Sequence, residues 1–567
     1  MKDVFKYRVG IVGCPARPDT EWNSENLERL CDLGFNVMQL NIAWGARPAD
    51  EPLNLEDVVE LPDEQEEEFG QPLPLKSDSS LERRQQRKDD LRRRIQLCRN
   101  AGVRTVFHFG APYNGCYGYD GTELPNCLLD SKTERRYLVL LEQFAKEYPG
   151  VDDLLVYTFD QDAWVCNEFG SCKNCRGIPL HQRVTPFVNK LAGKWQELNP
   201  GGTLWWEPWE LSAGQVLKSI ENLSPSGIAG LSLHSNIAEV MATMPVDRWL
   251  KNACSLAAQR GIEVIVEGWL GAASEELEPF VHLAHPLVTL RQLRAIAAVD
   301  GVCGVKEYFG LLPDKEDPNL RMTGLFLTAP ELSEQEALAE LVRPYGPVAD
   351  RMIEFWKICS EAMELFPWET SWYIREIGKC NVQHSMDAAF IRGQQCATPS
   401  WESSRRAVFM KTDDAQPHPW MLEDVQLRCD MAARRMDEAV LLGRRLEKEI
   451  PDGVFADFSA GLTELDGFAR RAWSYVYHLR ETNLATTMRK IRACGDEVPD
   501  SLKEEMLDVL KKDQKNQQSA EPLGCAIQLF KQDVDEFLNT YFKEKNGYKT
   551  LGGVSLKDAD FSVTSRN

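Results

Sequence analysis

Acidic residues recur at the ends of apolar, strand-like segments of this sequence. Asp160 and Asp162 follow the run LLVYTF. Glu207 directly follows the run TLWW, and Glu210 comes shortly after it. Glu267 ends the run VIV in the same way. Burying a carboxylate without a partner is costly, so acidic residues at several strand ends indicate a functional site. Two carboxyl groups flanking one bond, one as acid and one as nucleophile or base, are what glycoside hydrolysis requires.

The same carboxylates also have ordinary structural interpretations. Asp160 could cap the next helix, and Asp162 could simply be solvated. Others could form ion pairs with Arg or Lys, and Glu307, which directly follows Lys306, is the first candidate for such a pair. We nevertheless assign to the predicted catalytic pool Asp160, Asp162, Glu207, Glu210 and Glu267.

Aromatic and polar side chains accompany these acids. Flat rings with polar handles suit the apolar face of a sugar ring. Histidines and amides at strand ends, as in the segments VFHFG and GLSLHSN, could donate hydrogen bonds to hydroxyl groups. Core packing is the alternative for the rings, and a satisfied buried position is the alternative for each histidine. The predicted substrate-binding residues are Trp44, His108, Tyr113, Trp164, Trp209, His234, Asn236, Trp269, Glu307 and Tyr308.

Three cysteines, Cys166, Cys172 and Cys175, follow Asp162 closely. A CxxC pair with a third cysteine nearby resembles half of a structural zinc site. The fourth ligand is missing locally, and the candidates for it are Cys127, Cys116 and His181. Three reduced thiols or a disulfide are the alternatives. We predict that the three cysteines stiffen this loop, with structural zinc as a candidate ion, and that catalysis requires no cofactor.

The segments that would position these residues alternate between strand and helix patterns. Strands are predicted at 7–14, 36–44, 104–113, 154–162, 203–209, 228–236, 263–269 and 302–309. Helices are predicted between them at 24–33, 81–101, 134–148, 180–198, 213–222, 246–260 and 287–299, with Ser24 as the first cap. Eight such alternations over about 300 residues predict a (β/α)8 barrel, which carries its chemistry at the carboxyl ends of its strands. A doubly wound sheet is the alternative, but no glycine-rich phosphate loop follows the first strand.

Beyond residue 330 the period of the apolar residues becomes helical. Helices are predicted at 333–343, 348–366, 421–450, 463–482, 502–513 and 526–543, with a flexible connection at 512–519. This pattern predicts an α/β chain of two domains, with a (β/α)8 catalytic barrel at 1–330 and a mostly α-helical domain at 331–567.

Composition limits the partners of the chain. A net charge of −22 argues against nucleic acid, whose phosphates demand basic grooves. No apolar run is long enough to span a bilayer, and the N-terminus lacks the pattern of an export signal. We therefore expect a cytoplasmic protein with reduced cysteines and no membrane partner. The expected partners are a carbohydrate substrate and, if the chain is a homo-oligomer, further copies of itself.

The layout resembles that of (β/α)8-barrel glycoside hydrolases with a C-terminal helical domain, such as families 20, 84, 89 and 163. The resemblance covers residues 7–330 as architecture. In several of these families one acid after the fourth strand orients an N-acetyl group and an adjacent acid protonates the leaving oxygen. The resemblance gives these roles to Asp160 or Asp162, although Gln161 separates the two here.

A second pattern among these hydrolases places the acid after the fourth strand and the nucleophile after the seventh. Asp162 and Glu267 match it in position, although the Asn-Glu pair expected at the acid is absent. The predicted function is hydrolysis of a glycosidic bond, with N-acetylhexosaminidase-like specificity as the finer prediction. A non-catalytic carbohydrate-binding protein and a barrel lyase or isomerase acting on a sugar are the alternatives.

Overall fold

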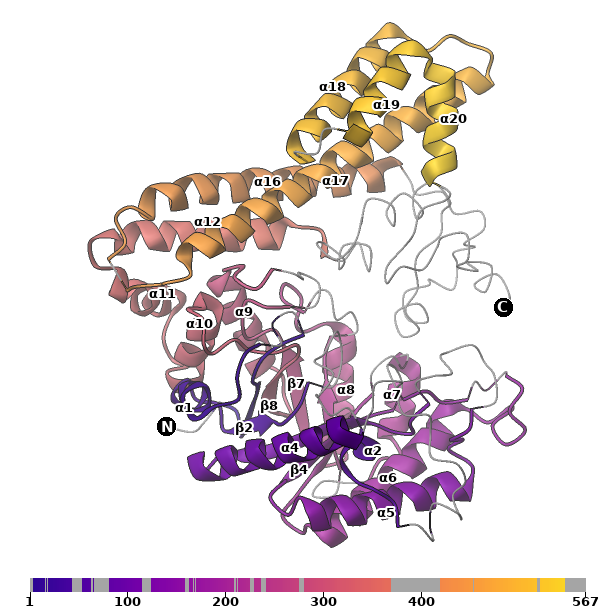
Figure 1. The fold of residues 1–567 in the computed structure, drawn as a ribbon, viewed down its shortest axis with the longest axis vertical. Helices are drawn as coiled ribbons and strands as arrows, with labels where there is room; N and C mark the ends of the chain where they lie inside the picture. Colours follow the sequence, from indigo (N-terminus) through magenta and orange to yellow (C-terminus); the bar gives the residue numbers. More distant parts are fainter. Residues whose placement is uncertain are drawn as a thin grey trace. The chain divides into compact units, whose positions relative to one another are not determined.

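The computed structural model describes residues 4–15, 17, 19–42, 54–62, 65, 81–114, 124–158, 163–166, 168, 170–208, 211, 213–224, 229–235, 241–274, 280–368, 419–451, 453–517 and 521–545. Its first part is a closed barrel of parallel strands in the order β1 to β8 (Figure 1). The strands are β1 (Tyr7–Ile11), β2 (Val37–Gln39), β3 (Arg104–Gly110), β4 (Asp153–Tyr157), β5 (Leu204–Glu207), β6 (Ala229–Leu233), β7 (Val264–Gly268) and β8 (Val302–Glu307). The predicted (β/α)8 barrel is confirmed.

Helices follow the strands and lie around them in Figure 1. They are α1 (Ser24–Asp32), α2 (Leu55–Val58), α4 (Leu81–Ala101), α5 (Ser131–Glu147), α6 (Leu180–Leu198), α7 (Ala213–Ile220), α8 (Arg248–Gln259), α9 (Pro286–Ala297) and α10 (Pro318–Thr328). The predicted cap of the first helix was wrong by one residue. The side chain of Asn23, not Ser24, accepts the backbone N–H of Asn26, so Ser24 is the first helical residue.

The barrel interior is filled by an apolar cluster toward the amino ends of the strands. Side chains from six strands meet there: Val9, Val37, Val106, Leu155, Trp205 and Ile265. Successive residues of a strand point to opposite sides, so the residue two positions further along each strand also faces the interior. On β2, β3, β4, β5 and β7 those next interior residues are Gln39, His108, Tyr157, Glu207 and Glu267. The apolar layer therefore lies beneath a polar one.

The described residues pack into two compact units. One contains the described residues up to Ser274 and from Thr289 to Ala337, and the other contains 280–288 and the described residues from Leu338 on. The predicted boundary at residue 330 falls between α10 and α11 (Glu334–Val342), and the domain division itself stays a prediction.

The second unit is helical, as predicted. It contains the 3-10 helix η3 (Arg343–Val348), α12 (Ala349–Leu365), α16 (Pro419–Leu446), α17 (Phe458–Ala493), α18 (Asp500–Gln517), α19 (Glu521–Gln532) and α20 (Val534–Lys545). Two predictions were wrong here. The connection expected from residue 512 is helical to Gln517, and the single helix expected over 526–543 is two helices, because Asp533 accepts the N–H groups of Asp535 and Glu536.

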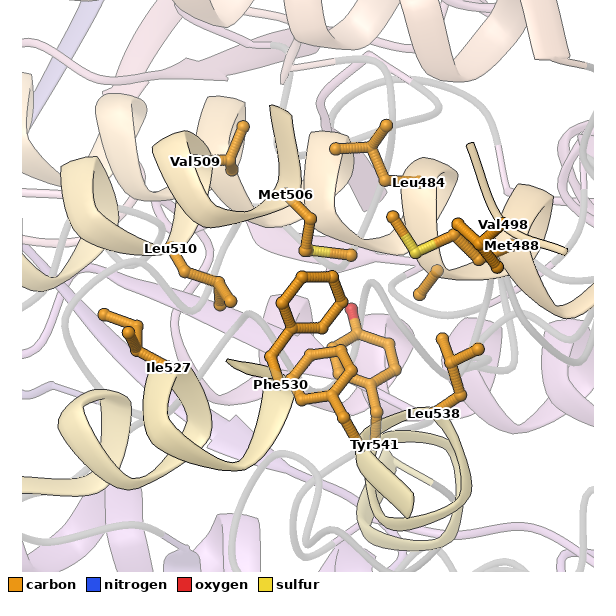
Figure 2. Close-up of a cluster of buried hydrophobic side chains, with 12 residues drawn as sticks. Leu484, Met488, Val498, Met506, Val509, Leu510, Ile527, Phe530, Leu538 and Tyr541 are labelled. Atoms are coloured by element: carbon orange, nitrogen blue, oxygen red, sulfur yellow. The ribbon is translucent and has the colours of Figure 1, made fainter. Parts of the chain in front are cut away.

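Apolar side chains of the last four helices form one cluster. Figure 2 shows side chains of α17, α18, α19 and α20 directed toward one another. Phe530 and Phe537 meet edge to face with ring centroids 4.9 Å apart. The hydroxyls of Thr482 and Tyr541 lie 2.9 Å apart, which satisfies both groups inside the cluster. No helix in the described part of the chain is long and apolar enough to cross a membrane.

Candidate active site

The polar layer of the barrel interior is the candidate site. It is made of side chains at the carboxyl ends of the strands, where barrels of this kind carry their chemistry. His108, Glu207 and Glu267 are buried, with exposed fractions of 0%, 1% and 0%. Lys306 on β8 joins them and is also fully buried. Two carboxyl groups, one ammonium group and one imidazole thus share a space from which water is largely excluded.

Glu267 lies between a cation and a hydroxyl. It pairs directly with Lys306 in the register of β7 and β8, so both side chains emerge on the same side of the sheet. The Nζ of Lys306 is 3.6 Å from the Oε1 of Glu267. Ser232 on β6 donates its hydroxyl to the same oxygen. These contacts offset part of the cost of burying a carboxylate.

Glu207 contacts a histidine that is held rigidly by its backbone. The Nε2 of His108 is 2.7 Å from the Oε2 of Glu207, within ion-pair distance. The side-chain oxygen of Asn41 accepts the backbone N–H of His108 at 2.9 Å, and its nitrogen donates to the carbonyl of His108 at 2.7 Å. The ring of Tyr157 stands edge-on to that of His108, with centroids 5.3 Å apart. Asn41 therefore fixes the histidine from beyond the end of β2.

The two glutamates are electrostatically coupled. Burial raises the pKa of Glu267, and the neighbouring charge of Glu207 raises it further, against the opposing charge of Lys306. Burial also raises the pKa of Glu207, while the charge of Lys306 lowers it. Burial and mutual repulsion therefore both disfavour two simultaneous negative charges on this pair.

Part of the hydrogen-bonding capacity of the pair is unused. Among the described residues, none donates a hydrogen bond to Oε1 of Glu207 or to Oε2 of Glu267. Buried polar atoms in folded proteins normally have partners, and exceptions concentrate at functional sites. These oxygens can accept a water or a substrate hydroxyl. The arrangement can hold, donate and recover a proton in a dry site, which is general acid–base chemistry.

His234 and Tyr308 lie beside this pair. Their rings are 6.2 Å apart and nearly perpendicular. Burial lowers the pKa of His234, while the charge of Glu267 raises it. The net direction is downward, so the imidazole is neutral at pH 7; its Nδ1–H donates to the carbonyl of Ser235, and its Nε2 is the acceptor.

The structure pairs Lys306 with Glu267 rather than with Glu307, its expected partner. The carboxylate of Glu307 accepts the backbone N–H groups of Leu270 at 2.8 Å, Phe309 at 2.7 Å and Gly310 at 3.1 Å. The cation beside it in sequence reaches Glu267 instead, because adjacent strand residues point to opposite sides. Burial raises the pKa of Glu307 to about 7, against these backbone hydrogen bonds. The geometry gives Glu307 a role in holding the ends of β7 and β8 together.

The other predicted aromatic residues that the structure describes form hydrogen bonds through their backbone groups. Trp269 is 1% exposed, and its N–H and carbonyl both bond the amide of Gln292, at 3.0 and 2.7 Å. Tyr113 is buried, and its N–H donates to the hydroxyl of Tyr137 at 2.6 Å. The carbonyl of Trp164 accepts from Asn114 at 2.7 Å. A substrate-binding role for these residues stays a prediction.

Several predicted site residues lie outside the described residues. These are Asp160, Asp162, Glu210, Trp44, Trp209 and Asn236. Their roles stay predictions from the sequence. Of the predicted pool, the structure brings together Glu207 and Glu267, with His108, His234 and Tyr308 around them.

The sequence interpretation missed two members of this layer, Lys306 and Tyr157. Both could have been found from the period of two, because each lies two residues beyond an interior position of its strand. The predicted ion pair joins Lys306 to Glu307, the carboxylate next to it in sequence. Tyr157 enters the sequence interpretation only as part of an apolar run.

The predicted cysteine cluster is real and contains a fourth member. The sulfur atoms of Cys127, Cys166, Cys172 and Cys175 all lie within 4.8 Å of one another, and all four residues are buried. None of the four is in a disulfide. The structure places Cys127, from the connection between β3 and α5, against the predicted three. Of the other two candidates for the fourth position, Cys116 lies outside the described residues and His181 is not in the cluster.

No family model matches this sequence, and no curated protein matches it. Among solved structures, the chain is similar to a GH138 enzyme targeting pectin rhamnogalacturonan II, with a TM-score of 0.57, 10% identity, and coverage of 91% of this chain and 62% of that one. This chain therefore spans less than two thirds of that protein.

Two other solved structures are similar at a TM-score of 0.42. One is a mutant of the O-GlcNAc hydrolase of Thermobaculum terrenum, with 10% identity and coverage of 99% of this chain and 97% of that one. The other is a GH115 4-O-methyl-alpha-glucuronidase with specificity for decorated arabinogalactans, with 9% identity and coverage of 90% and 59%. At such identities the similarity to the GH138 enzyme shows the fold alone. Membership of families 20, 84, 89 or 163 stays a prediction.

Proposed function

We propose that this protein hydrolyses a glycosidic bond in a carbohydrate. The observation that carries the proposal is the coupled pair of Glu207 and Glu267, buried at the carboxyl ends of β5 and β7 beside Lys306. A carboxyl group whose pKa is raised keeps a proton near neutral pH and can give it to a leaving oxygen. The chemistry needs no metal or organic cofactor at the reacting bond.

Glu207 and Glu267 are the two carboxyl groups of the site that the structure describes. In the common two-carboxylate mechanisms the acting groups stand roughly 5 to 9.5 Å apart, because the sugar or a water lies between them. A further carboxylate can come from another strand end, and the sequence offers Asp160 and Asp162 after β4.

The remaining polar groups suit a hydroxylated substrate. The neutral His234 can accept a hydrogen bond from a hydroxyl group at Nε2, because its Nδ1–H faces the carbonyl of Ser235. The ring of Tyr308 stands beside that of His234, and the imidazole of His108 lies against Glu207. The finer proposal is N-acetylhexosaminidase-like specificity. It rests on the resemblance noted in the sequence, in which acids after the fourth strand orient an N-acetyl group.

Turnover of a panel of aryl glycosides, N-acetylhexosaminides included, tests the proposal. With an active substrate in hand, Glu267→Gln and Glu207→Gln should each lower kcat by about 10²- to 10⁴-fold, the usual contribution of a positioned acid or base. Glu263→Gln is the matched control, because Glu263 lies just before β7 and its carboxylate accepts from Lys6 at 2.7 Å, away from the polar layer. Equal activity in all three variants would refute the roles of the pair. Sugar binding without turnover across the panel would favour a carbohydrate-binding protein.

One observation favours a second candidate, a lyase or isomerase acting on a sugar. A fully buried lysine beside a carboxylate, as Lys306 is beside Glu267, is also a typical arrangement for proton abstraction. Product analysis separates the two. Hydrolysis incorporates one oxygen from labelled water into the product. A lyase removes a carbon-bound proton and expels the leaving group, which creates a carbon–carbon double bond without adding water. An isomerase exchanges a carbon-bound proton with solvent and leaves the glycosidic bond intact.

A further inference from the structure

We infer that Cys127, Cys166, Cys172 and Cys175 form a closed, four-thiolate site for a structural zinc ion. The site is separate from the carboxyl pair, and the inference does not depend on the proposed hydrolase activity. It assigns to these residues a metal and a task, which is to fasten the connection after β3 to the connection after β4.

The distances between the sulfur atoms fit one ion at the centre of a tetrahedron. The Sγ of Cys127 is 3.3 Å from that of Cys175 and 3.8 Å from that of Cys172. With zinc–sulfur bonds of about 2.3 Å, a tetrahedral site separates its sulfur atoms by roughly 3.8 Å. A disulfide brings two sulfur atoms to about 2.05 Å, so the 3.3 and 3.8 Å contacts are not disulfide bonds.

The ligand set is soft and complete. Four thiolates select zinc over oxygen-preferring ions such as calcium or magnesium. Since protein sulfur atoms fill all four positions, no position is open for water or substrate, which is typical of a structural site rather than a catalytic one. Buried thiols make only weak hydrogen bonds to one another, so the four side chains gain little from this arrangement without an ion.

Backbone hydrogen bonds hold the turn that carries the CxxC pair. The N–H of Arg176 donates to the carbonyl of Cys172 at 3.1 Å, and the N–H of Ile178 donates to that of Cys175 at 3.0 Å. The guanidinium group of Arg183 is buried and donates to the carbonyl of Cys166 at 2.6 Å. Such outer contacts hold first-layer ligands in position.

A second set of contacts joins the same two connections. The side chain of Asn114 donates to the carbonyl of Trp164 at 2.7 Å and accepts the N–H of Asn126 at 3.1 Å. Asn126 directly precedes Cys127, and Trp164 packs against the thiol cluster. The hydrogen bonds and the four thiols therefore act at one junction, and zinc would close it.

Metal analysis of the full chain, purified without chelator, tests the inference. We expect about one zinc ion per chain, and near none in Cys127→Ser. Cys254→Ser is the matched control, because Cys254 is equally buried in α8 but is outside the cluster, and this variant should keep its zinc. Cobalt-substituted protein should show the thiolate charge-transfer and visible bands of a tetrahedral four-sulfur site.

Stability supplies a readout that is independent of catalysis. Removal of zinc by a strong chelator should lower the melting temperature of the wild type, and added zinc should restore it, while Cys127→Ser should respond to neither. Four outcomes would overturn the inference: no bound metal, stoichiometric iron in place of zinc, a disulfide among the four cysteines, or full zinc occupancy in Cys127→Ser. None of these outcomes bears on whether the chain hydrolyses glycosides.

Discussion

Replacing Lys306 by methionine tests the electrostatics of the barrel interior most directly. The substitution keeps most of the volume of the side-chain stem and removes its charge. At the 3.6 Å separation of Nζ and the Glu267 oxygen, the attraction is about 5 kcal/mol for an effective dielectric constant of about 20. The variant loses this attraction but no longer has to bury an ammonium group, and the second effect offsets part of the first. We expect a loss of about 3–5 kcal/mol in the free energy of unfolding at pH 7, the usual cost of breaking a buried pair.

The pH dependence of that loss identifies its cause. The folded-state pKa values of Glu207 and Glu267 are raised above the usual value for glutamate. A raised pKa gives stability that is complete at acid pH and is lost as the pH rises through the folded-state pKa. Without Lys306 both pKa values rise further. The variant should therefore approach wild-type stability toward about pH 4.5 and fall furthest below it at pH 7 to 8.

Urea denaturation of both proteins across this pH range measures the effect. Lys6→Met is the control, because Lys6 is 60% exposed and its ion pair with Glu263 should be worth about 0–1 kcal/mol. A loss in Lys306→Met that is the same at every pH would refute the electrostatic reasoning and indicate a packing defect. A loss no larger than that of the control would show that the buried lysine is not compensating the carboxyl pair.

Three further outcomes are expected. Gly110→Ala should lose about 1–3 kcal/mol in a urea melt, because the added carbon would meet the ring of Tyr157 at 2.5 Å. Arg104→Met should lose about 3–5 kcal/mol at pH 7, and less at acid pH, because it removes the two 2.6 Å contacts to the buried carboxylate of Asp153. Glu307→Gln should flatten the stability profile: the pKa of Glu307 rises from 4.5 to about 7, so about 3 kcal/mol of wild-type stability should disappear across that interval, as pH-dependent melting will measure.

The barrel could be predicted because each strand is encoded locally. Apolar, β-favouring runs alternate with amphipathic helices, and glycines with positive φ end several helices. Gly34, Gly102 and Gly261 have φ values of 95°, 68° and 67° at the ends of α1, α4 and α8. Each of these patterns spans only a few neighbouring residues, so it can be recognised in the sequence without knowledge of the tertiary structure.

The partners inside the site could not be predicted from local patterns, since they depend on how strands align. Lys306 faces Glu267 only because β7 and β8 pair with these two residues in register. The choice of Cys127 over His181 depends likewise on how two loops meet. Local spacing limits such candidates, but the spatial arrangement of distant segments decides among them.

A final prediction separates a functional pair from a structural one. When both carboxyl groups of the wild type are ionised, Lys306 balances only one of the two negative charges in the buried layer. In Glu267→Gln, the single carboxylate of Glu207 is balanced by the single positive charge of Lys306 whenever Glu207 is ionised. The variant should therefore be as stable as the wild type at acid pH and more stable by on the order of 1–4 kcal/mol at alkaline pH, the usual range for the repulsion of two neighbouring like charges.

Activity should move in the opposite direction, falling by about 10²-fold or more if the pair supplies the proton. Higher stability together with lower activity is typical of groups retained for function at a cost in stability. Paired measurements of urea stability and turnover on the same preparations decide the matter. If Glu267→Gln loses stability at every pH, the carboxyl pair is a structural element of the barrel and the acid must be sought elsewhere in the site.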